Sequence, residues 1–382
     1  MHLLLAFDSF KESLSSLQAA RCFQTGFKKV LPDAEIETIL LSDGGEGFVS
    51  ALTFQNGELQ KQKVTGPLGN PVNAQYGLMR GDQSAVIEMA AASGLELVPR
   101  NQRNPLKTTS YGTGELIRHA ISQGAKRIFI GIGGSATVDG GLGMAQALGV
   151  EFFEQSGKKL QDVLCGADLQ KIGRVSLDSL ADQIKQLEVI VACDVNNPWI
   201  GELGAARIFG PQKGATAEMI EELERGMENL AAVIRNDLGS EISSLPGAGA
   251  AGGLGGMLYA LLGAKLKSGI EIVLESVGFI DAAKKADLII TGEGRVDSQT
   301  IRGKTINGVT KIARNCKVPI LVIGGSIVEK DLPLLYDSGI DMTLSLLSTP
   351  TPLEEAIQNG AELMRQTGER VGRMVRFLPR NE

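Results

Sequence analysis

Short apolar runs alternate with amphipathic segments near both ends of the chain. The runs at 2–7 and 35–41 have the length of buried strands, and apolar residues recur between them at helical spacing, at Leu17, Ala20, Phe23, Phe27 and Val30. The alternation returns after residue 285, with strand-like runs at 287–291, 319–323 and 342–346. Strands and helices in alternation are typical of a parallel sheet covered by helices. The pattern therefore predicts a discontinuous Rossmann-like α/β domain, made of residues 1–60 plus 285–382.

The pattern changes between these two segments. Residues 61–79 form two alternating runs around a Pro/Gly turn, which predicts a β-hairpin. Helical patterns separate further strand-like runs at 85–89, 127–132 and 187–193, and a long amphipathic helix is predicted from about Ala217. We therefore expect an inserted domain of mixed α/β structure with glycine-rich loops over residues 61–284.

Residues 126–149 of this inserted segment predict a strand, a glycine-rich turn and a helix in succession. Gly133, Gly134 and Ser135 carry little or no side chain, so a ligand can approach the backbone there. The predicted helix from Leu142 would point its free N–H groups back over the turn, which favours binding of a phosphate or carboxylate. The alternative is that these glycines only allow tight packing. The glycine-rich stretch 247–256 is likewise either a second anion site or a hinge.

Acidic residues follow several of the predicted strands, namely Asp8, Asp43, Asp194, Glu293 and Asp297. The carboxyl ends of parallel strands meet at the edge of the sheet that binds ligands, so these carboxylates can face one ligand or cation. Each acid could instead stabilise the start of a helix. The capping-box spacing of Ser9 and Glu12 indicates such a cap for the first helix.

Basic residues lie on the same stretches of chain. Lys11 follows the first strand, and Lys213 precedes the long helix, where a cation opposes the helix dipole unless an anion compensates it. The predicted loop after residue 291 combines both signs of charge, at Glu293, Arg295, Asp297 and Lys304. This mixture suits a metal-bound polyphosphate, although a solvated charged loop would look the same.

The composition narrows the possible functions. A net charge of −6 argues against a large basic surface, so no nucleic-acid partner is expected. No signal peptide or long apolar run is apparent, so we expect a cytoplasmic protein without a membrane partner. The four cysteines form no CxxC pair, and so predict neither a zinc site nor a disulfide framework. With only two histidines, acid–base chemistry is expected to fall to carboxylates and lysines.

Three classes of function remain open from the residues alone. The combination of glycine-rich turns, acids and lysines suits phosphoryl transfer, but the chain contains neither a GxxxxGK[ST] loop nor the protein-kinase motifs. A dehydrogenase is the second class, because Gly131, Gly133 and Ala136 match GxGxxG/A, with Glu151 or Glu154 as the ribose-binding acid. A glycine-rich binding or scaffolding protein is the third, and it leaves the repeated acids and lysines unexplained.

Eight stretches carry a more specific signal: DSFKESLS (8–15), SDGGEG (42–47), IEMAAASGL (87–95), GIGGSATVDGG (131–141), CDVNNP (193–198), FGPQKGA (209–215), GAGAAGGLGG (247–256) and TGEGRVDSQT (291–300). In this order they resemble the bacterial glycerate kinase family, type I, and the resemblance extends through nearly the whole chain. Two positions depart from the family pattern. Glu12 stands where glycine is usual, and Val138 where asparagine is common, which removes a possible polar ligand group.

The resemblance implies a kinase that uses ATP and Mg²⁺ to phosphorylate D-glycerate in the catabolism of organic acids such as glycerate and glyoxylate. The usual product is 2-phosphoglycerate, and 3-phosphoglycerate is the less common one. The resemblance also implies a Rossmann-like domain and an inserted α/β domain, with the active site in the cleft between them. Whether the protein is a monomer or a homodimer stays open.

Residue chemistry assigns a role to each candidate. Asp194 or Asp8 is expected to act as base for, or to orient, the substrate hydroxyl, and Lys11 and Lys213 to neutralise phosphate charge. Three acids are expected to hold Mg²⁺ directly or through water, namely Asp43, Glu293 and Asp297. The groups expected to bind phosphate or substrate are the backbone N–H groups of Gly133, Gly134 and Ser135, the side chain of Ser9, and Arg295, which would pair with the substrate carboxylate.

Overall fold

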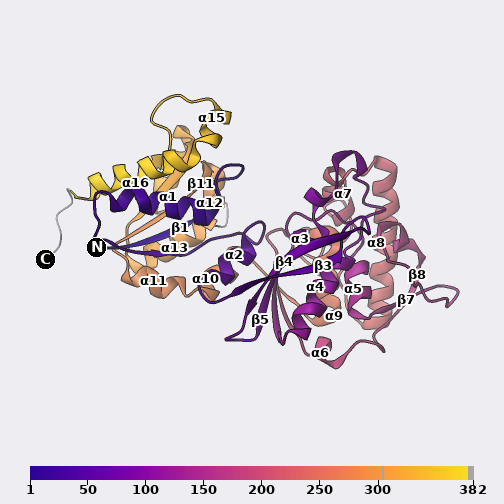
Figure 1. Ribbon diagram of the computed structural model, residues 1–382. Helices are drawn as coiled ribbons and strands as arrows, with labels where there is room; N and C mark the ends of the chain where they lie inside the picture. Colours follow the sequence, from indigo (N-terminus) through magenta and orange to yellow (C-terminus); the bar gives the residue numbers. More distant parts are fainter. Residues whose placement is uncertain (303–304, 377–382) are drawn as a thin grey trace. The chain divides into compact units, whose positions relative to one another are not determined.

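The computed structural model describes residues 1–302 and 305–376 (Figure 1). The described chain divides into two compact units. The first unit comprises residues 1–43 and 50–54 together with the chain from 270 onward, and the second comprises residues 44–49 and 55–269. Helix α2 (Phe48–Thr53) contains residues of both units. Among the described residues, none of the helices combines the length and the apolarity that a bilayer-spanning segment needs.

A five-stranded parallel sheet forms the centre of the first unit, in the order β13-β12-β11-β1-β2. Its strands are β1 (His2–Phe7), β2 (Glu35–Thr38), β11 (Leu288–Val296), β12 (Ile320–Ile327) and β13 (Met342–Ser345). The strands read as apolar runs because helices cover both faces of such a sheet. The chain adds β2 on one side of β1 and the later strands on the other, so the order of connection reverses between β1 and β11. This parallel sheet confirms the predicted α/β class.

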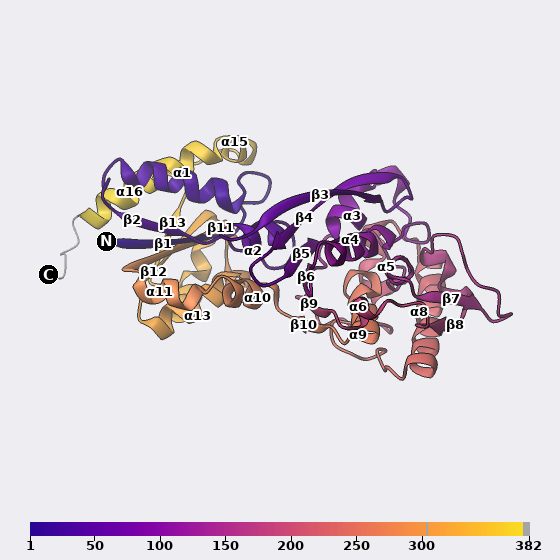
Figure 2. The ribbon, with the colours of Figure 1, turned by 60° about the horizontal axis from the view of Figure 1, so that its bottom comes forward.

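Helices cover both faces of this sheet (Figures 1 and 2). Helices α1 (Ser16–Lys28) and α16 (Gly360–Arg376) lie on one face, with α11 (Phe279–Lys285) and α13 (Thr305–Cys316) on the other. Glycine allows α1 and α16 to approach closely, because a Cβ at Gly26 would overlap the carbonyl oxygen of Arg365. The unit is completed by α10 (Gly269–Ser276), α12 (Ser298–Arg302), α14 (Leu332–Asp337) and α15 (Leu353–Gln358).

Two details of the first unit differ from the sequence-based prediction. Helix α1 is capped by Ser15, whose side chain and that of Gln18 form a reciprocal capping box, so the predicted cap at Ser9 and Glu12 is wrong. Strand β11 continues to Val296 because β12 pairs with it along this length, and the predicted end at residue 291 is also wrong.

The second unit contains a mixed six-stranded sheet in the order β10-β9-β6-β5-β4-β3. Strands β3 (Glu58–Thr65) and β4 (Pro71–Met79) form the predicted hairpin, and β5 (Ser84–Glu88) continues the antiparallel part. The parallel part follows with β6 (Arg127–Gly131), β9 (Glu188–Ala192) and β10 (Lys265–Lys267). A separate two-stranded sheet, β7 (Glu151–Glu154) and β8 (Ile172–Ser176), lies beside α8 (Figure 2).

The predicted long helix of this unit is α8 (Ala217–Leu238), which the hydroxyl of Thr216 caps at its start. Its shorter helices are α3 (Ala90–Ser93), α4 (Tyr111–Ser122), α5 (Leu142–Leu148), α6 (Asp182–Lys185), α7 (Ala205–Phe209) and α9 (Leu254–Leu262). Trp199 is completely buried among them, and its indole N–H donates to the carbonyl of Met227 at 2.9 Å. Polar burial of this kind needs a partner, which α8 supplies.

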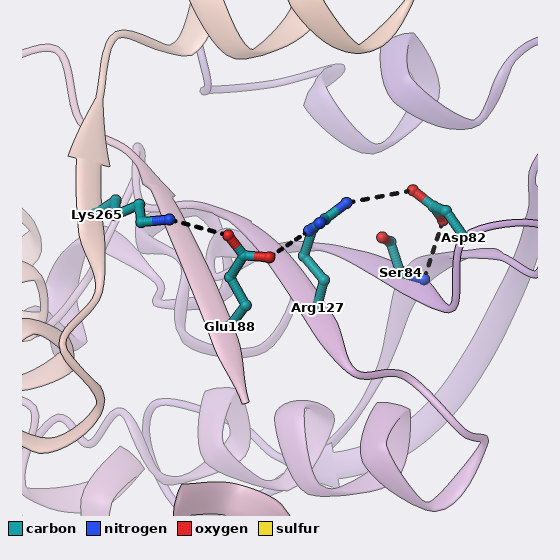
Figure 3. Close-up of polar contacts among 5 residues, drawn as sticks. All are labelled: Asp82, Ser84, Arg127, Glu188 and Lys265. Carbon is teal, nitrogen blue, oxygen red and sulfur yellow. Dashed lines mark hydrogen bonds and ion pairs between the residues drawn. The ribbon is translucent and has the colours of Figure 1, made fainter. Parts of the chain in front are cut away.

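An ion-pair ladder joins the amino ends of the parallel strands (Figure 3). Glu188 binds Arg127 at 2.7 Å and Lys265 at 3.1 Å, and Arg127 also lies 3.8 Å from Asp82, whose carboxylate accepts from the Ser84 N–H. The two cations hold the pKa of Glu188 below its usual range. The side chains of the ladder are partly exposed, so solvent screens their charges. The ladder supports the alignment of the strands at their amino ends.

Candidate functional site

Two carboxyl groups meet where the order of strands in the first unit reverses. Asp8 directly follows β1, and Glu293 lies on β11, the neighbouring strand. The register pairs Phe7 with Gly292, and the N–H of Asp8 donates to the carbonyl of Gly292 at 3.0 Å. Parallel α/β sheets bind their ligands at this kind of position, outside the carboxyl ends of the strands. The carboxyl pair Asp8 and Glu293 is therefore the centre of the candidate site in the first unit.

Burial shifts the titration of both acids toward neutral pH. It raises the pKa of Asp8 to about 6, against the hydrogen bonds from the Ser9 N–H and the Thr305 hydroxyl, which lower it. It raises the pKa of Glu293 to about 7, although the Thr300 hydroxyl donates to Glu293 at 2.7 Å and lowers it. Neighbouring acids strengthen both shifts and Lys11 weakens them. Acids shifted in this way are typical of sites that transfer protons or bind cations.

A tight turn brings Lys11 over β11. The N–H of Phe10 donates to the carbonyl of Leu14 at 2.8 Å, and the N–H of Leu14 returns a bond of 2.9 Å. The turn passes so close to β11 that a Cβ at Gly294 would lie 3.7 Å from the backbone nitrogen of Lys11. Lys11 is exposed, and its charge acts on Asp8 and Glu293.

Glu12 occupies the left-handed region in this turn, with φ of +65°. A side chain strains that conformation by about 1–2 kcal/mol, which gives a physical reason for the glycine that is usual here in the resembling family. We expect Glu12→Gly to stabilise the protein by about 0.5–1 kcal/mol, since the relief of strain exceeds the extra chain entropy of glycine. Urea unfolding measures the change. Glu12→Ala keeps the strain and serves as the control, so an equal gain in both variants would contradict the explanation.

Among the other residues predicted for the site in the first unit, Arg295 and Asp297 form an ion pair. Arg295 is 70% exposed, and its Nε lies 2.9 Å from the Asp297 carboxylate. The other Asp297 oxygen accepts from the N–H of Gln299 at 2.8 Å and so caps α12. Asp43 is exposed and raises the pKa of Asp8. Because β11 is longer than predicted, Glu293 and Arg295 lie on a strand and not in one charged loop; Lys304 lies outside the described residues.

These acids fit a cation that arrives together with phosphate. Within residues 1–302 and 305–376, no three acidic, histidine or cysteine side chains are close enough to hold a metal ion by themselves. Magnesium is commonly held by one or two carboxylates, with water and substrate phosphates as the other ligands. Glu293 and Asp43 match this pattern better than a metal cage built from protein alone.

In the second unit, the parallel strands β5, β6 and β9 end side by side, since Glu88 pairs with Gly131 and Gly131 with Ala192. The anion loop, which we define as Gly133–Ser135, is separated from the end of β6 by one residue. No described residue accepts a hydrogen bond from the three N–H groups of this loop. Gly133 and Gly134 are exposed, and Gly134 has φ of +70°. The loop therefore offers backbone donors to a ligand, as its glycines predict.

The start of α5 does not offer such donors, contrary to the prediction. Asp139 is 0% exposed and accepts from the N–H groups of Gly141 at 3.1 Å and Gly143 at 3.3 Å. It also accepts from the N–H and hydroxyl of Ser110 at 2.8 and 2.6 Å, and the Ser110 hydroxyl in turn accepts from Met144. A carboxylate of the chain itself thus occupies the helix N-terminus.

Lys213 lies beneath the anion loop. Its side chain is 2% exposed, and Nζ donates to the Ser135 hydroxyl and to the Thr137 carbonyl, both at 2.7 Å. Burial lowers the pKa of Lys213 to about 7, and the negative charge of Asp139 acts in the opposite direction. The ammonium group therefore contacts the loop from the buried side.

The carboxylates of Asp194 and Glu88 accept hydrogen bonds from backbone N–H groups. Asp194 accepts from the N–H of Gly269 at 3.1 Å, where α10 begins, and Glu88 accepts from the N–H of Val49 at 2.8 Å. Val138 is fully buried in the core, so that position offers no ligand group.

Sequence reasoning assigned no role to Asp139, Thr300 or Thr305. Asp139 stands inside the glycine-rich motif and could have been noticed there. Nothing in the local pattern distinguishes the two threonines from others in the chain.

The dinucleotide-binding alternative lacks its structural context. Helix α5 begins only at Leu142, whereas that fingerprint requires a helix N-terminus within the glycine motif. Glu151 lies on β7 and binds Lys159 and Ser179, so it is engaged by its own neighbours.

Comparison with known proteins identifies the family of this chain. The glycerate kinase family model matches residues 3–376. A glycerate kinase of Bacillus subtilis is 48% identical over 99% of this chain and 98% of its own, and glycerate 2-kinase of Escherichia coli K12 is 45% identical over 94% of this chain and 93% of its own. A crystal structure of a related protein from Salmonella typhimurium LT2 superposes with a TM-score of 0.88 at 46% identity, covering 98% of both chains. The chain belongs to the glycerate kinase family.

Proposed function

We propose that this protein transfers the γ-phosphoryl group of ATP to the 2-hydroxyl of D-glycerate, giving 2-phosphoglycerate and ADP. The observation that carries the proposal is the carboxyl pair Asp8 and Glu293 at the strand reversal, in a chain that belongs to the glycerate kinase family. The name of the Escherichia coli relative, glycerate 2-kinase, supports transfer to the 2-hydroxyl over the 3-hydroxyl.

Asp8 is the base in this proposal. The 2-hydroxyl oxygen attacks the γ-phosphorus, the bond from that phosphorus to the leaving ADP oxygen breaks, and the hydroxyl proton passes to the Asp8 carboxylate. A base with a pKa of about 6 is ionised at neutral pH yet basic enough to accept a proton during the transfer. Lys11 supplies positive charge on the exposed side of the same pair, where the phosphoryl group carries its negative charge.

Glu293 and Asp43 would hold the Mg²⁺ of the nucleotide, with Asp297 acting through water because its own oxygens bind Arg295 and Gln299. When bound, the ion neutralises charge on the phosphates. The nitrogens of Arg295 that do not bind Asp297 would pair with a substrate carboxylate, and Ser9 would add a polar contact beside Asp8. The anion loop would bind an anionic oxygen of glycerate or ATP.

Several expectations stay predictions: a role of Asp194 on the substrate hydroxyl, direct contact of Lys213 with phosphate, an active site shared by both units, a cytoplasmic location, and the choice between monomer and homodimer.

A coupled assay tests the proposal. Purified protein is incubated with D-glycerate, ATP and Mg²⁺, and ADP is measured by chromatography, while pyruvate is measured with enolase and pyruvate kinase present. We expect ADP only when glycerate and Mg²⁺ are both present, and pyruvate only when enolase is added. ADP without pyruvate would move the transfer to the 3-hydroxyl. If no ADP forms with D-glycerate, ATP and Mg²⁺ all present, the kinase proposal for this chain is overturned.

A further inference from the structure

Lys213 is held at both ends of its side chain. Its backbone ends a short 3₁₀ turn (Pro211–Lys213), and the following Gly214 packs so closely that a Cβ there would lie 2.8 Å from the Cβ of Arg103. Its Nζ bridges the Ser135 hydroxyl and the Thr137 carbonyl at 2.7 Å each. The ammonium group thus contacts both Ser135 and Thr137, the residues before and after Ala136. Lys213 is only 2% exposed.

The contact with Lys213 determines what the Ser135 hydroxyl can do. An ammonium group only donates hydrogen bonds, so the Ser135 oxygen accepts from Lys213 and keeps its own proton for another acceptor. In the part of the chain that the structure describes, no atom accepts that proton or the N–H groups of the anion loop. A charged donor on the oxygen also polarises the hydroxyl, which makes it a stronger donor.

We infer that Lys213 is a positioning residue, which holds the Ser135 hydroxyl as a donor to an anionic oxygen of the substrate and does not itself contact that oxygen. The oxygen belongs to a carboxylate or a phosphate, and therefore to D-glycerate or ATP. The inference deepens the proposed function and rests on it. It differs from the direct neutralisation of phosphate by Lys213 that the residue type alone suggests.

Kinetics of Ser135→Ala, Lys213→Met and the double variant test the inference. Each single variant is expected to raise the KM of the same substrate about tenfold, which corresponds to the loss of one hydrogen bond to a charged group, about 1.4 kcal/mol. The KM of the other substrate should stay within about twofold. The KM of the double variant should be no higher than the higher KM of the two single variants, because both substitutions remove the same contact. The substrate whose KM changes identifies the bound oxygen as carboxylate or phosphate.

Lys158→Met is the matched control, because it removes the same charge from an exposed position of the same unit. Its KM values should equal those of the parent protein. If Lys213→Met does not fold, the parent and Ser135→Ala are compared across pH. The affected KM of the parent should rise through about pH 7 as Lys213 loses its proton, with Asp139 the other charged group that acts on it. Ser135→Ala should lack this rise.

Two results would overturn the inference: effects that multiply in the double variant, or a raised KM in Lys213→Met with none in Ser135→Ala, which indicates direct contact. If the parent protein phosphorylates no glycerate, the proposed function fails separately. Calorimetry with inorganic phosphate then tests the same contact. Equal weakening in both single variants supports the inference, and unchanged affinity in either variant contradicts it.

Discussion

Glu293→Gln is expected to lower kcat by about 10²-fold or more and to raise the Mg²⁺ concentration needed for half-maximal activity. Glutamine keeps the size of the side chain and can still accept the hydrogen bond from Thr300. It removes the charge that we propose to hold Mg²⁺ at the strand reversal. Steady-state rates at saturating ATP and D-glycerate, measured over a range of Mg²⁺ concentrations, separate the two effects.

The same variant is expected to change the pH dependence of stability. The pKa of Glu293 is raised from its usual value to about 7, so the folded state binds more protons than the unfolded state between these two values. The stability that the protonated group contributes is therefore complete at low pH and is lost as pH rises through about 7. In the absence of Mg²⁺, Glu293→Gln should gain on the order of 1 kcal/mol relative to the parent between about pH 5 and pH 8, after allowance for solvent screening. Urea unfolding at the two pH values measures this gain.

Glu271→Gln provides the control for both measurements, because Glu271 is an exposed acid of the first unit. It should change neither kcat nor the pH dependence. Normal turnover of Glu293→Gln at the parent's Mg²⁺ requirement would remove Glu293 from the site. A stability difference that does not change with pH would show that the acid is already ionised in the folded protein near pH 5.

Asp139→Ala is expected to destabilise the second unit by about 3–5 kcal/mol. The carboxylate is completely buried and accepts four hydrogen bonds, two from Ser110 and one each from the N–H groups of Gly141 and Gly143. Alanine leaves these donors without an acceptor and removes the negative charge that acts on the buried Lys213. Asp139→Asn should lose less stability, because the oxygen of the amide can still accept some of these four hydrogen bonds.

Chemical unfolding of Asp139→Ala and of Asp162→Ala, an exposed acid of the same unit, measures the effect. The control should lie within about 0.5 kcal/mol of the parent. Adding Lys213→Met to Asp139→Ala should restore part of the loss, since it removes a buried cation that has lost its compensating charge. A loss below about 1 kcal/mol in Asp139→Ala would mean that water replaces the carboxylate at the start of α5.

Most elements of the fold could be predicted from local pattern. The hairpin β3–β4, strand β5 and the start of α8 at Ala217 occur where the spacing of apolar residues indicates. Errors arose where hydrogen bonds that the apolar pattern does not reveal decided the outcome. Strand β11 runs to Val296 because β12, a distant segment, pairs with it there. The start of α1 is displaced to Ser16 by the hydrogen bonds between Phe10 and Leu14 in the turn just before it.

The candidate site likewise contains residues that the local pattern predicts and residues that it does not. Asp8 and Glu293 could each be predicted as candidates, together with Asp43, Asp194 and Asp297, because each follows an apolar run. That Asp8 and Glu293 lie on neighbouring strands is decided by the pairing of β1 with β11. Their hydroxyl partners Thr300 and Thr305 could not, since nothing local distinguishes a threonine that contacts a carboxylate from one that faces solvent.

The sequence by itself determined the α/β class, the family and the residue types available for phosphoryl transfer, because periodicity and motifs are written along the chain. Only the tertiary structure decided which polar groups remain available to a ligand. Asp139 and Lys213 belong to ligand-like motifs, yet both are buried, with Asp139 occupying the start of α5 and Lys213 bound to Ser135, 78 residues away. The reason is physical: desolvation and hydrogen bonding depend on neighbours in space, and these come from segments far apart in the chain.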